Sequence, residues 1–291
     1  MLQQPRRGGG EGRTTAAKSA AVSLHLGIIR IAESAGDAIL DVYRREDHGA
    51  TRKADDSPLT LADRAAHDVI VAGLAELDPG TPVLSEESEP VTDGERLEWG
   101  RFWLVDPLDG TKEFLKRNGE FTVNIALIEG GRPVLGVVHA PVLATTYWAT
   151  LGGGAYKREG AAADRRIGVS DYRASGLRVV ASRSHAGERL ARFLGALESH
   201  ECISKGSSLK LCLVAEGAAN LYPRFGPTME WDIAAAAIVV TEAGGTITDV
   251  EGRDLTFNKA NLLNAQFVVC GRPAYPWANV LASLDAEAES A

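Results

Sequence analysis

The sequence predicts a layered protein in which an α+β half precedes an α/β half. Two amphipathic helical patterns come first, followed by short apolar runs separated by glycines and charged turns, as is typical of antiparallel strands. After about residue 175, strand-like and helix-like segments alternate. Such alternation favours helices packed on a sheet, and the 291 residues are enough for two compact domains.

The first two elements are predicted to be helices. Apolar residues recur every three or four positions over 22–43 and again over 60–77, and the second pattern ends at Asp78-Pro79-Gly80. The preceding segment, 1–20, is basic, glycine-rich and poor in apolar residues. It is expected to be a disordered tail rather than a signal peptide.

The remaining elements follow from the changes of period. Strands of a largely antiparallel sheet are predicted at 82–84, 102–105, 121–128, 134–139 and 145–149. In the second half the predicted strands are 177–181, 220–223 and 267–270, and the predicted helices are 187–197, 207–216, 232–243 and a final helix. With the boundary in the charged, glycine-containing stretch 157–176, we expect an N-terminal α+β domain at 21–165, which carries metal-binding motifs. A C-terminal α/β domain at 166–291 is expected to complete the metal site and bind substrate.

Composition narrows the class of protein. A net charge of −8 argues against a nucleic-acid polymer as partner, because phosphate-binding surfaces are rich in Lys and Arg. Three cysteines are too few and too scattered for a disulfide framework, so we expect buried thiols in a reducing cytoplasm. No apolar run has the length of a transmembrane segment. The expected location is the cytoplasm, either free or peripherally attached to the inner membrane, and the oligomeric state stays open.

The most informative segment reads FWLVDPLDGT, at 102–111. An apolar strand carries Asp106 and Asp109 to its end, where Pro107 favours an extended backbone before a turn. Both carboxylates are expected to converge on a hard cation such as Mg²⁺, with the Leu108 carbonyl as a further oxygen. Gly110 permits close backbone approach, and a helix opening with Thr111-Lys112-Glu113-Phe114 would direct its amides at an anion such as phosphate.

Each acidic element also has an ordinary structural interpretation. The 106–111 segment is compatible with a surface turn in which Asp109 caps a helix. Glu86, in a run of acidic residues, is compatible with a solvated loop, and Asp232 with a helix cap. The metal-site interpretation gains weight only when the three elements are considered together.

Three motifs in order resemble the inositol monophosphatase superfamily of magnesium-dependent, lithium-sensitive phosphatases: Glu86-Glu87, DPLDGT at 106–111, and Trp231-Asp232. Four segments resemble, more narrowly, the bisphosphate nucleotidases of this superfamily: DPLDGTKEFLKRNGEFTVN at 106–124, SRSH at 182–185, GSSLKLCLVAEG at 206–217 and YPRFGPT at 222–228. The resemblance covers about residues 24–280. It implies a layered αβαβα sandwich made of an α+β half and an α/β half.

The resemblance also implies a cofactor, Mg²⁺, with two or three ions. The first metal site would take Glu86, Asp106 and the Leu108 carbonyl, and the second Asp106, Asp109 and Asp232. Crowded carboxylates repel one another, and bound cations offset that repulsion.

Two further residues match the Thr and Asp that orient the attacking water in this family, namely Thr111 and Asp63. The resemblance makes them the catalytic pair. Considered alone, Asp63 is equally compatible with a surface position in the first turn of a helix, where the helix dipole stabilises it.

Substrate contacts implied by the resemblance come from Gly110, Thr111, Lys112, His185, Ser207, Lys210 and Arg224. Lys112-Glu113 stand where inositol phosphatases usually carry Thr-Asn, which favours a nucleotide. Considered singly, Lys210 and Arg224 are compatible with charged side chains exposed to solvent. His185 is compatible with a polar residue whose hydrogen bonds are satisfied within the protein, and Ser207 with an N-cap.

The resemblance therefore predicts a phosphomonoesterase that hydrolyses adenosine 3',5'-bisphosphate, a small molecule, to AMP and phosphate. This step clears a by-product of sulfate assimilation. The enzymatic alternative is an inositol monophosphatase or a broad sugar-phosphate phosphatase. A non-catalytic metal or nucleotide sensor on the same fold is the alternative from another class.

Overall fold

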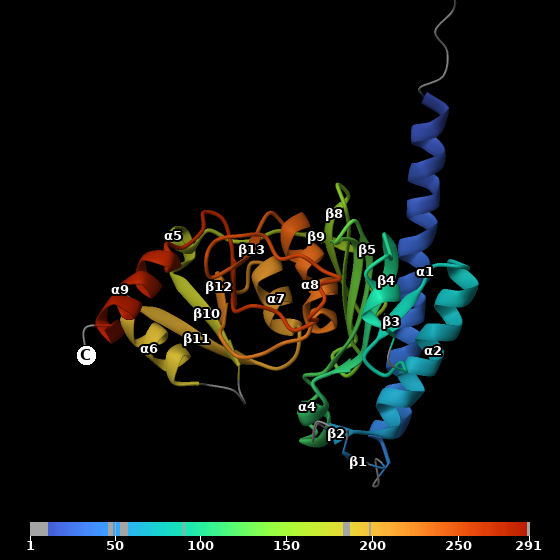
Figure 1. Ribbon diagram of the computed structural model, residues 1–291, viewed down its shortest axis with the longest axis horizontal. Coiled ribbons are helices and arrows are strands. Elements are labelled where there is room, and N and C mark those ends of the chain that lie inside the picture. Colours follow the sequence, from blue (N-terminus) through green and yellow to red (C-terminus); the bar gives the residue numbers. More distant parts are fainter. Residues whose placement is uncertain are drawn as a thin grey trace, which may run out of the picture.

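A seven-stranded sheet forms the centre of the first half of the chain (Figure 1). The computed structural model describes residues 11–45, 49, 51–52, 58–89, 91–182, 187–197 and 199–289. The sheet strands, in the order in which they pair, are β3 (Val83–Ser85), β4 (Arg101–Asp109), β5 (Thr122–Glu129), β6 (Arg132–Ala140), β7 (Thr145–Thr150), β8 (Gly154–Glu159) and β9 (Arg165–Ile167). All neighbours are antiparallel except β3 and β4. The expected antiparallel sheet is confirmed, with a parallel first pair.

Helices and a small ribbon complete the first half. They are α1 (Glu11–Tyr43), β1 (Thr51–Arg52), β2 (Pro58–Leu59), α2 (Leu61–Leu77), α3 (Asp93–Arg96) and α4 (Thr111–Leu115). The hydroxyl of Thr60 caps the first turn of α2 by accepting a hydrogen bond from the Ala62 amide. This cap places the start of α2 where the sequence predicts it.

A five-stranded sheet dominates the second half, in the order β11 (His200–Lys205), β10 (Leu177–Ser182), β12 (Leu221–Arg224), β14 (Phe267–Cys270) and β13 (Thr246–Asp249). Strands β10, β11 and β12 are parallel, whereas β14 is antiparallel to both of its neighbours. The helices are α5 (Tyr172–Ser175), α6 (Glu188–Ala196), α7 (Leu209–Ala215), α8 (Glu230–Glu242) and α9 (Trp277–Glu289). The chain leaves one sheet after Ile167 and enters the other at Leu177, but the division into two domains stays a prediction.

Helical layers and sheets alternate across the molecule (Figure 1). Helices α1 and α2 cover one face of the large sheet, α7 and α8 lie between the two sheets, and α6 and α9 cover the far face of the small sheet. The αβαβα sandwich is thus confirmed. In this order both faces of the seven-stranded sheet and of the five-stranded sheet have a helical layer to pack against.

The alternation of side chains along β4 shows why this strand is apolar throughout. Trp103 and Val105 pack towards α1 and α2, whereas Phe102 and Leu104 pack towards the central helices. A strand buried on both faces reads as a continuous apolar run, and successive side chains point to opposite faces. The strand therefore delivers Asp106 and Asp109 at the end of a rigid, buried element.

The structure corrects three expectations. Helix α1 begins at Glu11, so it includes part of the segment expected to be a disordered tail. The stretch 14–21 is rich in alanine, which favours helix, and a helix that has already formed extends at little cost. Residues 1–10 lie outside the described residues.

Helix α7 begins at Leu209 rather than at Ser207, because Ser207 has a φ of +48°, which is not helical. Cys202 is exposed on the edge strand β11, whereas Cys212 and Cys270 are buried as expected. Among the described residues, none of the helices combines the length and the apolar character that crossing a bilayer requires.

Candidate active site

Strands β3 and β4 bring two acidic residues side by side. The strands are parallel, and Ser85 lies opposite Val105. The residue that follows each of them is acidic, namely Glu86 just after β3 and Asp106 within β4. The Glu86 amide donates a 3.1 Å hydrogen bond to the Val105 carbonyl, which fixes this register.

A β-bulge then turns the chain so that Asp109 joins them. Asp106 pairs with Asn124 and Asp109 with Thr122, so β4 contains an extra residue relative to β5. The Leu108 amide donates a 3.0 Å hydrogen bond to Asp106 Oδ1, which closes the bulge locally. Bulges change the direction of side chains in this way. The spacing of Asp106 and Asp109 across Pro107-Leu108 therefore forms the bulge and also brings the two carboxylates together.

Gly110 makes the turn into α4 possible. Its φ of +93° lies in the left-handed region, and a Cβ there would be 3.3 Å from the Glu120 carbonyl oxygen. Few residues other than glycine adopt such a conformation at low cost. Thr111 therefore begins α4 directly beside Asp109.

Asp63 and Thr111 meet although they are far apart in sequence. Thr111 Oγ1 lies 3.5 Å from Asp63 Oδ1, at the outer limit of a hydrogen bond. The other oxygen of Asp63 accepts hydrogen bonds from the amide and the hydroxyl of Thr60, at 2.7 and 2.6 Å. Asp63 is 2% exposed, which excludes the surface interpretation of this residue.

The second half of the chain contributes a loop that precedes α7. The Ser208 amide donates a 2.6 Å hydrogen bond to Asp109 Oδ2. The Ser208 hydroxyl donates to Asn124 Oδ1 and lies 2.8 Å from the Thr122 hydroxyl oxygen. Strand β5 therefore holds this loop against the acidic end of β4.

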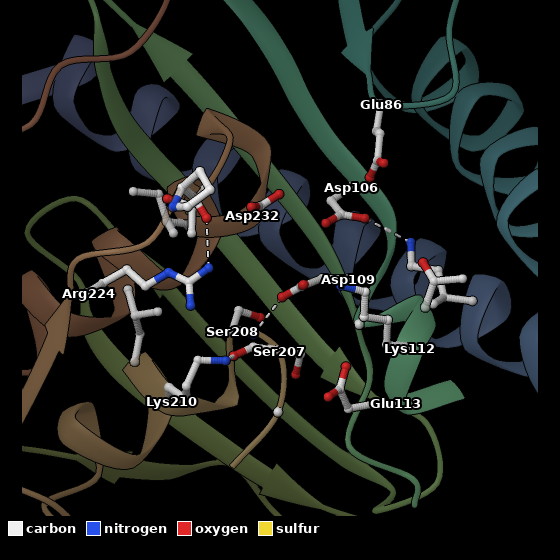
Figure 2. A pocket seen from close by; sticks show the side chains of 18 of the residues that line it. Glu86, Asp106, Asp109, Lys112, Glu113, Ser207, Ser208, Lys210, Arg224 and Asp232 are labelled. Atoms are coloured by element: carbon white, nitrogen blue, oxygen red, sulfur yellow. Dashed lines mark hydrogen bonds between the residues drawn. The ribbon is translucent and has the colours of Figure 1, made fainter. Parts of the chain in front are cut away.

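Lys210 and Arg224 supply positive charge on the opposite side of the cavity from Glu86 and Asp106 (Figure 2). Lys210 is buried, and its Nζ donates to the Ser207 carbonyl. Arg224 Nη2 donates a 2.7 Å hydrogen bond to the Pro227 carbonyl, whereas its buried Nε makes no hydrogen bond within the described residues. Buried donors normally find an acceptor, so this guanidinium is suited to an anionic ligand.

Asp232 comes from the first turn of α8. Its Oδ2 accepts a 2.9 Å hydrogen bond from the Met229 amide, which satisfies one of the free donors at the helix start. The prediction that it caps the helix is therefore correct, and its side chain lines the cavity as well.

Nearly all the predicted site residues line one cavity of about 360 Å³ (Figure 2). They are Glu86, Asp106, Leu108, Asp109, Gly110, Thr111, Lys112, Ser207, Lys210, Arg224 and Asp232. Asp63 is not part of the lining but reaches it through Thr111. His185 lies outside the described residues.

Crowding and burial set the protonation of the acidic residues. Burial, followed by the charges of Glu86 and Asp109, raises the pKa of Asp106 well above its ordinary value. Burial also raises the pKa of Asp109 to about 6, although the charge of Lys210 opposes this shift. Asp232 follows the same pattern, because burial and then the charge of Asp109 raise its pKa.

In Asp63 and Lys210, burial likewise competes with hydrogen bonding or with a neighbouring charge. Burial raises the pKa of Asp63 to about 6, against the hydrogen bonds from Thr60. Burial lowers the pKa of Lys210 to about 8, although the charge of Asp109 opposes this shift. Both groups therefore change charge close to neutral pH, as is common in active sites.

The donor set fits a hard divalent cation. Carboxylate oxygens are the ligands that Mg²⁺ prefers, and a cation would relieve the repulsion that raises their pKa values. Even so, no group of three or more His, Cys, Asp and Glu residues in the described ranges is arranged to hold an ion as it stands. The predicted ligands line a common cavity, and within the described residues they do not converge into a closed site.

Several lining residues were not predicted as site residues, namely Glu113, Gly206, Ser208, Leu211, Tyr222, Pro227, Thr228 and Ile233. The sequence did contain a signal for Tyr222, because it is two residues from Arg224 in a strand and so shares its face. Gly206 approaches the first half so closely that a Cβ would lie 2.8 Å from the Glu120 carbonyl oxygen. That contact joins the two halves of the chain, and no local sequence pattern indicates it.

Comparison with protein families and with known sequences finds similarity over most of the chain. The model of the inositol monophosphatase family matches residues 23–285. The 3'(2'),5'-bisphosphate nucleotidase CysQ of Salmonella typhimurium is 52% identical over 248 residues, covering 83% of this chain and 97% of that protein. CysQ of Escherichia coli K12 is 51% identical over 244 residues, with the same shares covered.

Solved structures agree with the sequence comparison. CysQ from Bacteroides thetaiotaomicron, a bacterial member of the inositol monophosphatase family, has a TM-score of 0.76 and 41% identity. The match covers 88% of this chain and 97% of that one. An IMPase from Thermotoga maritima has a TM-score of 0.74 and 25% identity, covering 89% and 96%.

Proposed function

The chain belongs to the inositol monophosphatase family, and we propose that it is a Mg²⁺-dependent 3'(2'),5'-bisphosphate nucleotidase. The proposed reaction converts adenosine 3',5'-bisphosphate and water to AMP and phosphate. It would clear a by-product of sulfate assimilation. Support comes from relatives of that name, about half identical over most of the chain.

The observation that carries the proposal is the division of charge within one cavity. Carboxylates from β4 and α8 lie on the same cavity as the cations Lys210 and Arg224. A substrate with two phosphates needs cation-bridged carboxylates at the phosphate that is cleaved and donors for the one that is kept. Arg224 lines this cavity, its Nε makes no hydrogen bond within the described residues, and guanidinium groups match phosphate geometry.

The proposed Mg²⁺ ligands are Glu86, Asp106, the Leu108 carbonyl, Asp109 and Asp232, for two or three ions. When bound, Mg²⁺ supplies positive charge that favours ionisation of a water molecule and offsets charge on the departing oxygen. Asp106 is proposed to contact two ions. Its position between Glu86 and Asp109 along the strand ends supports this assignment.

Asp63 and Thr111 are proposed to orient the attacking water. Asp63 is held rigidly by Thr60, so its second oxygen faces the Thr111 hydroxyl. In this arrangement Asp63 accepts from the Thr111 hydroxyl, and the Thr111 oxygen is then directed to accept from the water. A fixed acceptor reduces the reorganisation that the reaction requires.

Lys210, Arg224 and Ser207 are proposed to hold the retained phosphate and the ribose, together with Lys112, Gly110 and His185. Lys210 is fixed by the Ser207 carbonyl, and Arg224 by the Pro227 carbonyl. Their positions are therefore set before substrate binds, which lowers the entropic cost of binding.

The test compares phosphate release from adenosine 3',5'-bisphosphate and from inositol 1-phosphate in the presence of Mg²⁺. We expect faster release from the nucleotide, and inhibition when Li⁺ is added. Faster release from inositol 1-phosphate would instead assign the chain to the inositol or sugar-phosphate phosphatases. Metal binding without turnover of either substrate would identify a non-catalytic sensor.

A further inference from the structure

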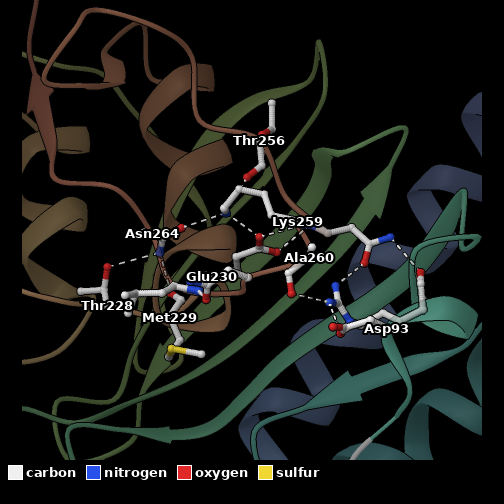
Figure 3. Close-up of polar contacts among 12 residues, drawn as sticks. Asp93, Thr228, Met229, Glu230, Thr256, Lys259, Ala260 and Asn264 are labelled. Carbon is white, nitrogen blue, oxygen red and sulfur yellow. Dashed lines mark hydrogen bonds and ion pairs between the residues drawn. The ribbon is translucent and has the colours of Figure 1, made fainter.

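A loop that is hydrogen-bonded to the first residues of α8 holds the start of this helix in place (Figure 3). We propose that Glu230 and Asn264 are positioning residues that set Asp232 through this loop, residues 256–264, here called the latch loop. The inference rests on the proposed function in that Asp232 is taken as a metal ligand. Glu230 and Asn264 do not line the cavity, so they act through other residues.

Glu230 is the centre of the contact. Its side chain is fully buried, at 0% exposed. Its Oε2 accepts a 2.6 Å hydrogen bond from the Asn258 amide, and its Oε1 accepts from the amide and the Nζ of Lys259. A buried carboxylate is tolerated only when it is paired and hydrogen-bonded, and here all of these donors come from the latch loop.

Asn264 fixes the residues just before α8. Its Nδ2 donates to the Met229 carbonyl at 2.8 Å and to Thr228 Oγ1 at 3.2 Å. The backbone continues the pairing, since the Asn264 amide donates to the Thr228 carbonyl and the Glu230 amide to the Leu262 carbonyl. The latch loop therefore runs beside 228–230 as a short paired segment.

The far end of the latch loop is anchored in the other half of the molecule. Arg96, which is 2% exposed, donates to Asn258 Oδ1 at 2.8 Å and to the Ala260 carbonyl at 3.2 Å. Asn258 Nδ2 donates in return to the Arg96 and Trp99 carbonyls. The latch loop thus fixes the position of the start of α8 relative to the half that supplies Glu86, Asp106 and Asp109.

Met229 connects the latch loop to the active site. Its carbonyl is held by Asn264, and its amide donates to Asp232 Oδ2 at 2.9 Å. A shift of Met229 would therefore move Asp232, and it would also displace Pro227, to whose carbonyl Arg224 donates. The latch loop sets a proposed metal ligand and a proposed phosphate contact together.

The test uses Glu230→Gln, which keeps the size of the side chain. One of the two oxygens becomes an NH₂ group that faces a backbone N–H, so a hydrogen bond is replaced by two opposed donors. The matched control is Asp249→Asn. Asp249 is also buried and likewise accepts from two backbone amides, of Glu251 and Arg253, and from a cation, Arg253 Nε. Among the described residues it takes no part in the hydrogen bonds of 228–232.

Two measurements compare the variants with the wild-type chain. Hydrogen exchange at the Met229 amide is expected to accelerate about 10-fold or more in Glu230→Gln, because the Asp232 contact is weakened. The Mg²⁺ dissociation constant from calorimetric titration is expected to rise by about 10-fold, the low end of the cost of disturbing an outer-shell partner. Asp249→Asn is expected to leave both within about twofold of wild type.

Unchanged exchange at Met229 in Glu230→Gln, or equal effects in both variants, would overturn the inference. Exchange is measured on the metal-free chain, so its result separates this inference from the proposed function. A wild-type chain that binds no Mg²⁺ would count against the proposed function alone. Asn264→Ala, which removes the contacts to Thr228 and Met229 and a 3.4 Å contact from Lys259 Nζ, gives a milder variant for the same two measurements if Glu230→Gln does not fold.

Discussion

The Asp109 carboxylate accepts a 2.6 Å hydrogen bond from the Ser208 amide, across 99 positions of sequence. Asp109 ends a strand of the large sheet, and Ser208 precedes a helix between the two sheets. This contact binds the acidic end of β4 to the loop that carries Ser207 and Lys210. The proposed metal site and the proposed phosphate site therefore share one fixed framework.

Removing the Asp106 carboxylate is expected to abolish most activity. Asp106→Asn should lower kcat/KM by more than about 100-fold, because outer-shell changes alone cost about 10–100-fold and Asp106 is proposed to contact two ions. The measurement is turnover across a Mg²⁺ titration, with circular dichroism to verify the fold. Asp41→Asn, at an exposed surface ion pair, is the control. Near-normal rates at saturating Mg²⁺ would exclude a bridging role.

Mg²⁺ should stabilise the protein more at pH 8 than at pH 5. The pKa values of Asp63 and Asp109 are raised from 3.8 to about 6, so the folded state binds protons more tightly than the unfolded state. Stability from protonation is full below about pH 4 and is lost as pH rises through about 6. Ionised carboxylates above this range repel one another and bind cations without displacing protons.

Thermal unfolding with and without Mg²⁺ at the two pH values measures this effect. The rise in Tm on adding Mg²⁺ is expected to be larger at pH 8. An equal or larger rise at pH 5 would contradict the assignment of Asp109 to a cation site. In Asp106→Asn the difference between the two pH values should shrink.

Lys210 should make nucleotide hydrolysis sensitive to pH in the alkaline range. Its pKa is lowered to about 8, so its charge is lost as pH rises through that value. The kcat/KM for adenosine 3',5'-bisphosphate is expected to fall over the same range. Lys210→Arg should retain its rate there, since arginine stays charged.

Lys210→Met should lower kcat/KM for the nucleotide by about 10- to 100-fold at pH 7, in line with a lost hydrogen bond to a charged group. The measurement is a pH profile for the wild-type chain and both variants. An alkaline limb that persists unchanged in Lys210→Arg would assign it to a different group.

Ser208 should contribute to stability as well as to the site. Its hydroxyl contacts Thr122 and Asn124, all three residues being buried. Ser208→Ala should lower the free energy of unfolding by about 1–3 kcal/mol, because buried partners lose a hydrogen bond. Urea unfolding measures this, with Ser283→Ala on an exposed part of α9 as the control. Equal stability of the two variants would show that the Ser208 contacts contribute little.

Local sequence was enough for the parts of the fold that depend on local periodicity. Helix α2, the apolar strand β4 and the change of pattern near residue 175 follow from spacing alone. The start of α1 was missed because the tail contains little apolar pattern, although its alanines favour helix. Cys202 was missed because exposure on an edge strand depends on the order of strands in the sheet.

For the site, the sequence by itself determined which carboxylates could act, because DPLDGT places two of them at a strand end with the proline and glycine that turn the chain. Only the tertiary structure decided that Asp63 meets Thr111, that Ser208 binds Asp109, and that the buried Glu230 accepts from Asn258. Together with the anchoring of the latch loop by Arg96, these contacts join residues 28 to 162 positions apart. Their energy comes from burial and from donors on distant elements, which no local pattern records.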